Sequence, residues 1–158
     1  MQGPPTSVAL RGAGWVEAAV LLASLQSGPH WAVRAPNGAT ARARITDDGR
    51  VEVGVRCGRP LDRVVLRSYC IGAAHMALGW VRSEGLAVDE QGVPVDLTIR
   101  SFGILRAVDT PHIEIEIDED DSEPVNGSDA VFAAVATAAW AAAGWQERWP
   151  TARVRSGA

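Results

Sequence analysis

One carboxylate stands out for its position in the chain. Glu123 closes the acidic run that begins at Asp118, and Pro124 and an almost wholly apolar stretch follow it. A carboxylate beside the start of a buried helix can be partly desolvated, which raises its pKa toward the range useful for general acid–base catalysis. The positive end of the helix dipole favours the anion and opposes that shift. Glu123 is therefore a candidate proton-transfer group, with a place in a solvated turn as the alternative.

Two further side chains could take part in such chemistry. His112 begins an alternating strand and could share a site opening with Glu123, although a loop histidine without partners is the commoner case. Tyr69 is the only tyrosine, and its hydroxyl could donate in a pocket or make one hydrogen bond in a core. His75 lies in a helical pattern and is better read as a structural histidine. The candidate catalytic set is thus Glu123, with His112 and Tyr69.

The other reactive residue types carry weaker signals. Cys57 and Cys70 lack metal-ligand spacing, so buried free thiols are favoured over a reactive thiolate. Residues 118–121 form a contiguous acidic run without the spaced ligands and glycine of a calcium loop. Asp62 precedes a helical pattern and is favoured as its N-cap rather than as a catalyst. No metal site is predicted.

Apolar residues at every second position predict the strands that would position these groups. Residues 41–45 and 51–55 alternate apolar and other side chains on either side of an Asp-Asp-Gly turn, which predicts a hairpin. Residues 112–117 alternate isoleucine with glutamate and predict a further strand. A short strand and turn are expected within 85–96, and an irregular loop over 101–111.

Helices account for the remaining apolar residues. We expect helices over 13–25, 62–84 and 127–144, the last buried because it is apolar nearly all round. In the second helix, Val65, Tyr69, Gly72 or Ala73, Met76 and Trp80 fall on one stripe, and Gly72 and Gly79 indicate close packing against another backbone. The six tryptophans, notably Trp15, Trp31, Trp80 and Trp140, are expected mostly in the core, with one or two lining a cavity or interface.

Bulk properties bound the class of protein. The 158 residues are 47% hydrophobic and 22% charged, which is typical of one globular domain with a loose tail over 150–158. The net charge of −4, with seven acids between Glu114 and Glu123, argues against a nucleic-acid surface. No signal peptide or bilayer-length apolar run is evident, so a cytoplasmic location is expected. All basic residues are arginine, which suggests a GC-rich bacterial genome. The element order predicts an α+β fold with a mostly antiparallel sheet covered by helices.

Several segments, in order, resemble the C-terminal part of the large subunit of molybdenum hydroxylases, the xanthine dehydrogenase and aldehyde oxidase family. "DDGRVEVGVRCGRPLD" is similar to that family's strand and Cys-Gly-Arg loop, and the glycine-containing helix after it also corresponds. "SFGILRAVDTPHIEIEI" and "DSEPVNGSDAVFAAVATAAWAAAG" resemble two later family segments. The resemblance covers about residues 41–144, and extends from about residue 12 if the first helix is included.

This resemblance implies a role for Glu123 and also sets limits. Glu123 falls at the family's catalytic glutamate, the base that deprotonates a metal-bound hydroxide. Cys70 falls where the family has a pterin-contacting glutamine, and "DDSEPV" replaces the glycine-rich approach to the glutamate. The family's catalytic chain is several times longer. An intact fold with altered cofactor contacts suggests a scaffold adapted to another use.

Three functions remain open on the sequence. The first is a cofactor-free enzyme in which Glu123 is the general acid or base for cyclisation, isomerisation or elimination of a small molecule, in bacterial natural-product biosynthesis. The second is an accessory subunit that completes a split molybdenum hydroxylase and shares its molybdopterin cofactor with a large partner chain. The third is a non-catalytic binding module. A homodimer is expected, because a lone copy of this family region would expose apolar surface.

Overall fold

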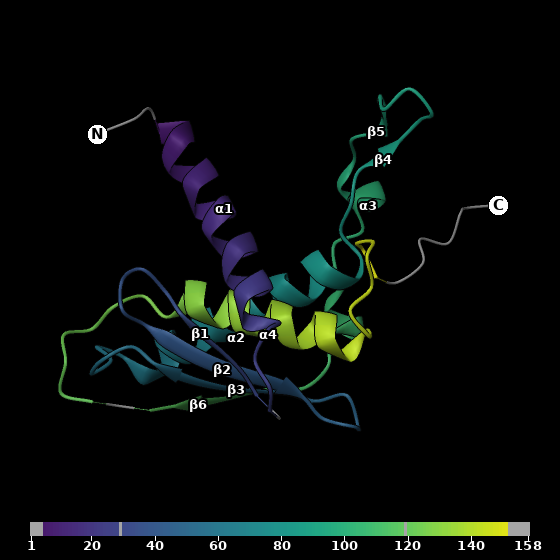
Figure 1. The fold of residues 1–158 in the computed structure, drawn as a ribbon. Helices are drawn as coiled ribbons and strands as arrows, with labels where there is room; N and C mark the ends of the chain where they lie inside the picture. Colours follow the sequence, from purple (N-terminus) through teal and green to yellow (C-terminus); the bar gives the residue numbers. More distant parts are fainter. Residues whose placement is uncertain (1–4, 29, 119, 152–158) are drawn as a thin grey trace.

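A computed structural model describes residues 5–28, 30–118 and 120–151, and it has the α+β architecture that the sequence predicts (Figure 1). The helices are α1 (Pro5–Ala23), α2 (Arg63–Arg82), α3 (Ile99–Phe102) and α4 (Ser128–Ala142), with a 3-10 turn, η1, over Ala107–Asp109. The strands are β1 (Trp31–Arg34), β2 (Thr40–Ile45), β3 (Val51–Arg56), β4 (Ala87–Val88), β5 (Pro94–Asp96) and β6 (Ile113–Ile117).

The main sheet has the strand order β1-β2-β3-β6. The predicted hairpin is confirmed: Ile45 pairs with Val51, and Gly49 in the turn between them has a φ of 86°. β6 is the predicted isoleucine–glutamate strand, but it pairs parallel to β3. Parallel neighbours need a long crossover, and here α2 and the segment after it supply one. The sheet is therefore mostly antiparallel with one parallel edge strand.

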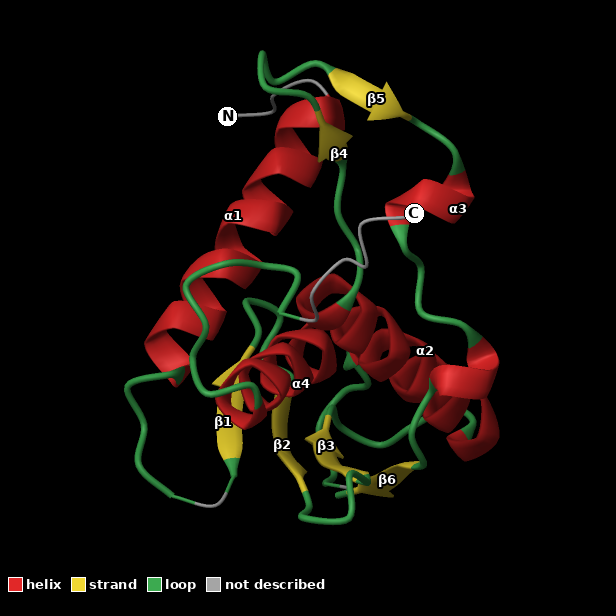
Figure 2. Ribbon diagram, turned by 90° about the vertical axis from the view of Figure 1, so that its right-hand side faces the viewer, coloured by secondary structure: helices red, strands yellow, loops and turns green. Residues whose placement is uncertain are grey.

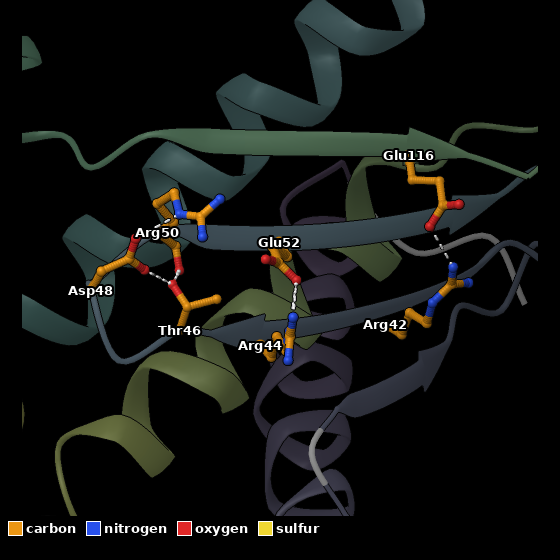
Figure 3. A network of polar contacts seen from close by, with 7 residues as sticks. All are labelled: Arg42, Arg44, Thr46, Asp48, Arg50, Glu52 and Glu116. Atoms are coloured by element: carbon orange, nitrogen blue, oxygen red, sulfur yellow. Dashed lines mark hydrogen bonds and ion pairs between the residues drawn. The ribbon is translucent and has the colours of Figure 1, made fainter.

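The two faces of this sheet differ sharply in polarity. α4 lies across the inner face, and α2 packs against α4 and along β6. On the outer face, Arg44 pairs with Glu52 at 2.6 Å and Arg42 with Glu116 at 2.7 Å (Figure 3). The inner face is made of small and β-branched side chains, all buried: Ala41, Ala43, Val51, Val53, Val55, Ile115 and Ile117.

Helix α4 is buried nearly all round, as predicted, and this decides which face of α2 turns inward. Because alanines let two helix backbones approach closely, α2 meets α4 through its own small residues. The buried residues of α2 are Cys70, Ala73, Ala74, Ala77, Leu78, Gly79 and Val81. By length and composition alone α2 could span a membrane, and its buried face packs inside this domain.

The apolar stripe that predicted the helix is confirmed as helical, but of its members only Ala73 is fully buried. Val65, Tyr69 and Met76 are exposed, and Trp80 is partly buried. Gly72 is exposed, with no neighbouring atom where a Cβ would stand. Gly79 is buried, but the group that crowds it is the carboxylate of Glu84 rather than another backbone. Several large side chains on this helix face solvent because mainly small ones, with Leu78 and Val81, make the contact with the core.

Two parts of the chain project from the helix-covered side of the body, away from the sheet (Figures 1 and 2). One is α1. The other is residues 86–104, here called the arm, which contains β4, β5 and α3. A hydrogen bond of 2.9 Å from Gly85 N to Phe102 O closes its base, and Gly103, with a φ of 78°, passes close to the carbonyl of Ser83. The two short strands replace the single strand expected from the sequence.

Several element boundaries differ from the sequence-based expectations. The first helix begins at Pro5 and ends at Ala23, and β1 was not predicted at all. The segment expected as an irregular loop contains the end of α3 and the turn η1. The predicted loose tail lies outside the described residues from residue 152 onward, while Thr151 N donates to Val81 O at 2.8 Å.

Candidate functional site

Two loops cross at the end of β3, and their crossing positions Glu123. Arg59 N donates to Ser122 O at 3.1 Å, and Val125 N donates to Cys57 O at 3.0 Å. Gly58 has a φ of 78°, and a Cβ there would collide with the backbone carbonyl of Glu123. Only glycine allows this approach without strain, so the Cys-Gly-Arg loop fixes the backbone of Glu123.

An open groove of about 340 Å³ lies beside this crossing, a volume at the lower end of the range of small-ligand sites. Its walls are mainly apolar, and the Tyr69 hydroxyl and the Asn126 amide supply polar groups. Asp62 also lies at the rim, where its Oδ1 accepts from Val64 N at 2.7 Å, which confirms the predicted N-cap. The lining residues are Cys57, Pro60, Leu61, Asp62, Val65, Leu66, Tyr69, Pro124, Val125 and Asn126.

Glu123 stands at the flank of the groove rather than in its wall. Its neighbour Pro124 lines the groove, but the Glu123 side chain is exposed. The partial desolvation considered from the sequence is therefore not provided by this chain alone. Tyr69, 65% exposed, lies in the groove wall with Pro124. The structure thus brings Glu123 and Tyr69 to the same region of the surface.

His112 is not part of this region. It precedes β6, where its carbonyl accepts from Val51 N at 2.9 Å, whereas Glu123 follows the other end of β6. A five-residue strand spans roughly 17 Å. The interpretation in which His112 shares a site opening with Glu123 is therefore wrong, because the strand that separates them in sequence also separates them in space.

Both cysteines are buried free thiols, as predicted. Burial, together with the negative charge of Asp120, raises the pKa of Cys57, and burial raises the pKa of Cys70 to about 11. Thiols of raised pKa are poor nucleophiles at neutral pH. Neither cysteine is a candidate for covalent catalysis.

The remaining candidates have structural partners. His75 is half-buried, and its Nδ1 lies 3.0 Å from Thr110 Oγ1, in keeping with a structural histidine. In the acidic run, Asp118 pairs with Arg42 at 2.5 Å and Asp120 bonds to Ser122. Within the described residues, no group of His, Cys, Asp and Glu side chains could hold a metal ion.

The groove does not fit a molybdenum–pterin group held by this chain alone. A pterin phosphate needs basic or backbone donors, but the described lining contains no arginine and is mainly apolar. Cys70, at the position where the resemblance places a pterin-contacting glutamine, is fully buried and cannot reach a ligand. No chemical step is therefore derived through this cofactor on these residues.

The sequence suggests Tyr69 and Glu123 as candidates but does not predict the groove that Tyr69 lines and Glu123 flanks. Pro60, Leu61, Val65 and Asn126 come from three separate segments, and only their folded arrangement makes a cavity. The signals present in the sequence were the turn residues of "CGRP" and "EPVNG", which mark loops without showing that the loops meet.

Comparison with solved structures extends the family resemblance to the fold. Neither protein-family models nor curated protein sequences gave a match. The Cu,Mo-CO dehydrogenase structure, in its carbon monoxide reduced state, matches 72% of this chain with a TM-score of 0.57 and 14% identity. Reconstituted CO dehydrogenase from Oligotropha carboxidovorans gives the same values. Quinoline 2-oxidoreductase from Pseudomonas putida 86 matches 68% of this chain with a TM-score of 0.50 and 21% identity.

The matched region is a small part of each of these proteins. The chain spans only 17% of the CO dehydrogenase chain and 16% of the quinoline 2-oxidoreductase chain. At these identities the similarity concerns the fold and not the activity. Over about two thirds of its length or more, the chain therefore has the fold found in the C-terminal part of molybdenum hydroxylase large subunits.

Proposed function

We propose that this chain is a subunit that docks through its arm onto a separate chain and completes a larger, molybdenum-hydroxylase-like assembly. The observation that carries the proposal is the apolar surface of the arm. Leu97 and Ile99 are each 76% exposed, and Val95 is 63% exposed. The other exposed apolar side chains of the arm are Leu86, Val88, Val93, Phe102 and Ile104.

Such a surface is unusual for a chain that acts alone. Contiguous apolar patches beyond a few hundred Å² on soluble proteins generally mark interaction sites. The arm also projects from the body (Figures 1 and 2), so its two strands and α3 present this surface to a partner rather than to the core. The partner that fits is a chain with the remaining part of a molybdenum-hydroxylase-like large subunit, since this chain spans only 17% of such a structure.

Docking would also give Glu123 a role. The carboxylate is exposed but its backbone is fixed by Gly58 and Arg59. The groove lies at the start of α2 and the arm follows its end, so a partner large enough to cover both would place this fixed carboxylate at the contact between the two chains. Any molybdenum cofactor would belong to the partner chain, since the groove itself does not fit one.

Affinity purification of the tagged chain from its natural host tests the docking proposal. We expect a molybdenum-hydroxylase-like chain to co-purify in a fixed ratio, identified by mass spectrometry. The variant Val95→Asp with Leu97→Asp should lose this partner, because it places charge in an apolar contact, while Glu123→Gln should keep it. Equal recovery with the arm variant, or a monomeric chain in both cases, would overturn the proposal.

A second candidate, supported by the groove, is a metal-free enzyme acting on a small uncharged organic molecule. The molecule would occupy the apolar walls, with the Tyr69 hydroxyl as a donor and Glu123 as the acid or base for cyclisation, isomerisation or elimination. If so, Glu123→Gln should lower turnover at least ~100-fold with an unchanged melting temperature. Asp121→Asn, in the same acidic run, should change turnover less than about threefold, and a similar loss in both variants would contradict a specific role.

The homodimer expected from the sequence would use the same surface of the arm. Light scattering on the isolated chain at about 100 μM, which would populate a dimer of micromolar affinity, measures this directly. A dimer that dissociates in the Val95→Asp, Leu97→Asp variant would identify a second copy as the occupant of the arm. If the isolated chain is a monomer, the proposal that the arm binds a separate chain stands.

A further inference from the structure

A second groove, which shares no lining residue with the first, has three tryptophans in its wall. It has a volume of about 340 Å³ and lies between α1 and the segment after α4. Trp80, Trp140 and Trp149 line it, and Val20 and Leu21 of α1 complete its apolar wall. Three indole rings in one open groove offer aromatic surface to a small ligand.

The rings are held at fixed mutual angles. Trp149 meets Trp80 with ring centroids 4.6 Å apart and an interplanar angle of 81°, and it meets Trp140 at 5.6 Å and 73°. Trp140 Nε1 donates to Gln146 O at 2.8 Å, and Thr151 N to Val81 O at 2.8 Å, so the turn carrying Trp149 is tied to α4 and α2. The rings pack edge to face on one another, so they form an open corner rather than a flat patch.

The charge at this groove is of one sign. Glu17 of α1 and Glu147 of the C-terminal turn both line it, and both are exposed. Neither carboxylate takes part in an ion pair with the side chains described over residues 14–28, 30–118 and 120–151, and no described arginine lines the groove. Aromatic faces and free carboxylates together attract cations and disfavour anions.

We propose that this tryptophan groove binds a small quaternary ammonium ion. Such a cation is attracted by the negative faces of indole rings and, unlike a primary ammonium, has little hydration to lose. Its methyl groups would lie against the apolar corner that the rings form, and the two carboxylates supply long-range attraction. A neutral apolar ligand would use the rings but not the carboxylates. A hydrated metal ion would use the carboxylates but gain little from the rings.

Titration of the full chain with choline chloride at constant ionic strength tests the proposal. Isothermal calorimetry and tryptophan fluorescence should both give saturable binding, with a Kd on the order of 1 mM or tighter. The neutral isostere 3,3-dimethyl-1-butanol, which has the same shape without the charge, should bind at least ~10-fold more weakly. Equal binding of the two compounds, or no saturation, would overturn the proposal.

Variants separate the two parts of the site. Glu17→Gln with Glu147→Gln replaces exposed side chains by isosteres, so the fold should persist while choline binding weakens at least ~5-fold. Glu90→Gln, in the exposed turn of the arm, removes a charge elsewhere and should leave binding unchanged. Unchanged binding in the double variant, or the same loss in Glu90→Gln, would show that the groove carboxylates do not recognise the cation.

Discussion

The body and the arm use apolar residues in opposite ways. In the body, most of the buried residues of α4 are alanines, which pack against the sheet and α2. Helix α4 itself has few large apolar side chains. In the arm, valine, leucine and isoleucine are exposed on or beside two short strands and a single helical turn. Larger side chains have more to gain from burial, so their exposure in the arm is the costlier arrangement. The inner layer of the body is thus packed by this chain itself, whereas the larger apolar side chains of the arm stay exposed on it, which is why we propose the arm as the docking surface.

The largest expected contrast compares a leucine from each region. Leu78 on α2 is 0% exposed, and Leu78→Ala should lower the free energy of unfolding by about 2–5 kcal/mol because it leaves a cavity. Leu97 on the arm is 76% exposed, so Leu97→Ala should stay within about 0.5 kcal/mol. Urea unfolding followed by circular dichroism measures both. A similar loss at Leu97 would mean that the arm packs on the isolated body.

A pair of glycines gives the next contrast. Gly58 and Gly92 have φ values of 78° and 80°, so an alanine is strained at both by about 1–2 kcal/mol. At Gly58 the new Cβ also meets the Glu123 carbonyl, whereas at Gly92 it meets nothing within 4 Å. Gly58→Ala should therefore cost a further ~1–3 kcal/mol in unfolding free energy. Equal losses of unfolding free energy in Gly58→Ala and Gly92→Ala would show that the two crossing loops can move apart and do not fix the backbone of Glu123.

The smallest contrast compares two helix caps. Asp62 Oδ1 accepts from Val64 N at 2.7 Å at the start of the 20-residue α2, so Asp62→Ala should cost about 1 kcal/mol. Thr98 Oγ1 lies 3.4 Å from Ser101 N at the start of the four-residue α3, and Thr98→Ala should cost less than about 0.5 kcal/mol. Thermal unfolding of both variants measures the difference. A larger loss at Thr98 would show that α3 stabilises the isolated chain.

For the candidate site, local patterns identified single residues but not their neighbours. The turn and capping signals around Asp62 and the position of Glu123 before an apolar helix are readable because each depends on a few adjacent residues. The groove depends on Pro60, Tyr69 and Asn126, which lie in three segments, so no local pattern contains it. His112 was grouped with Glu123 because the two are close in sequence, and a straight strand placed them at opposite ends.

The sequence by itself determined the elements whose signals are local: the hairpin over 41–55 with its Asp-Gly turn, the cap at Asp62, and the burial of α4. Only the tertiary structure decided the parallel pairing of β6 with β3 and the inward face of α2. Strand partners are chosen between segments far apart in sequence. The face of α2 was chosen by how closely α4 approaches, since helical periodicity defines stripes without saying which one meets a partner. The exposure of Glu123 and of the arm has the same origin, because burial depends on what covers a residue as well as on the residue itself.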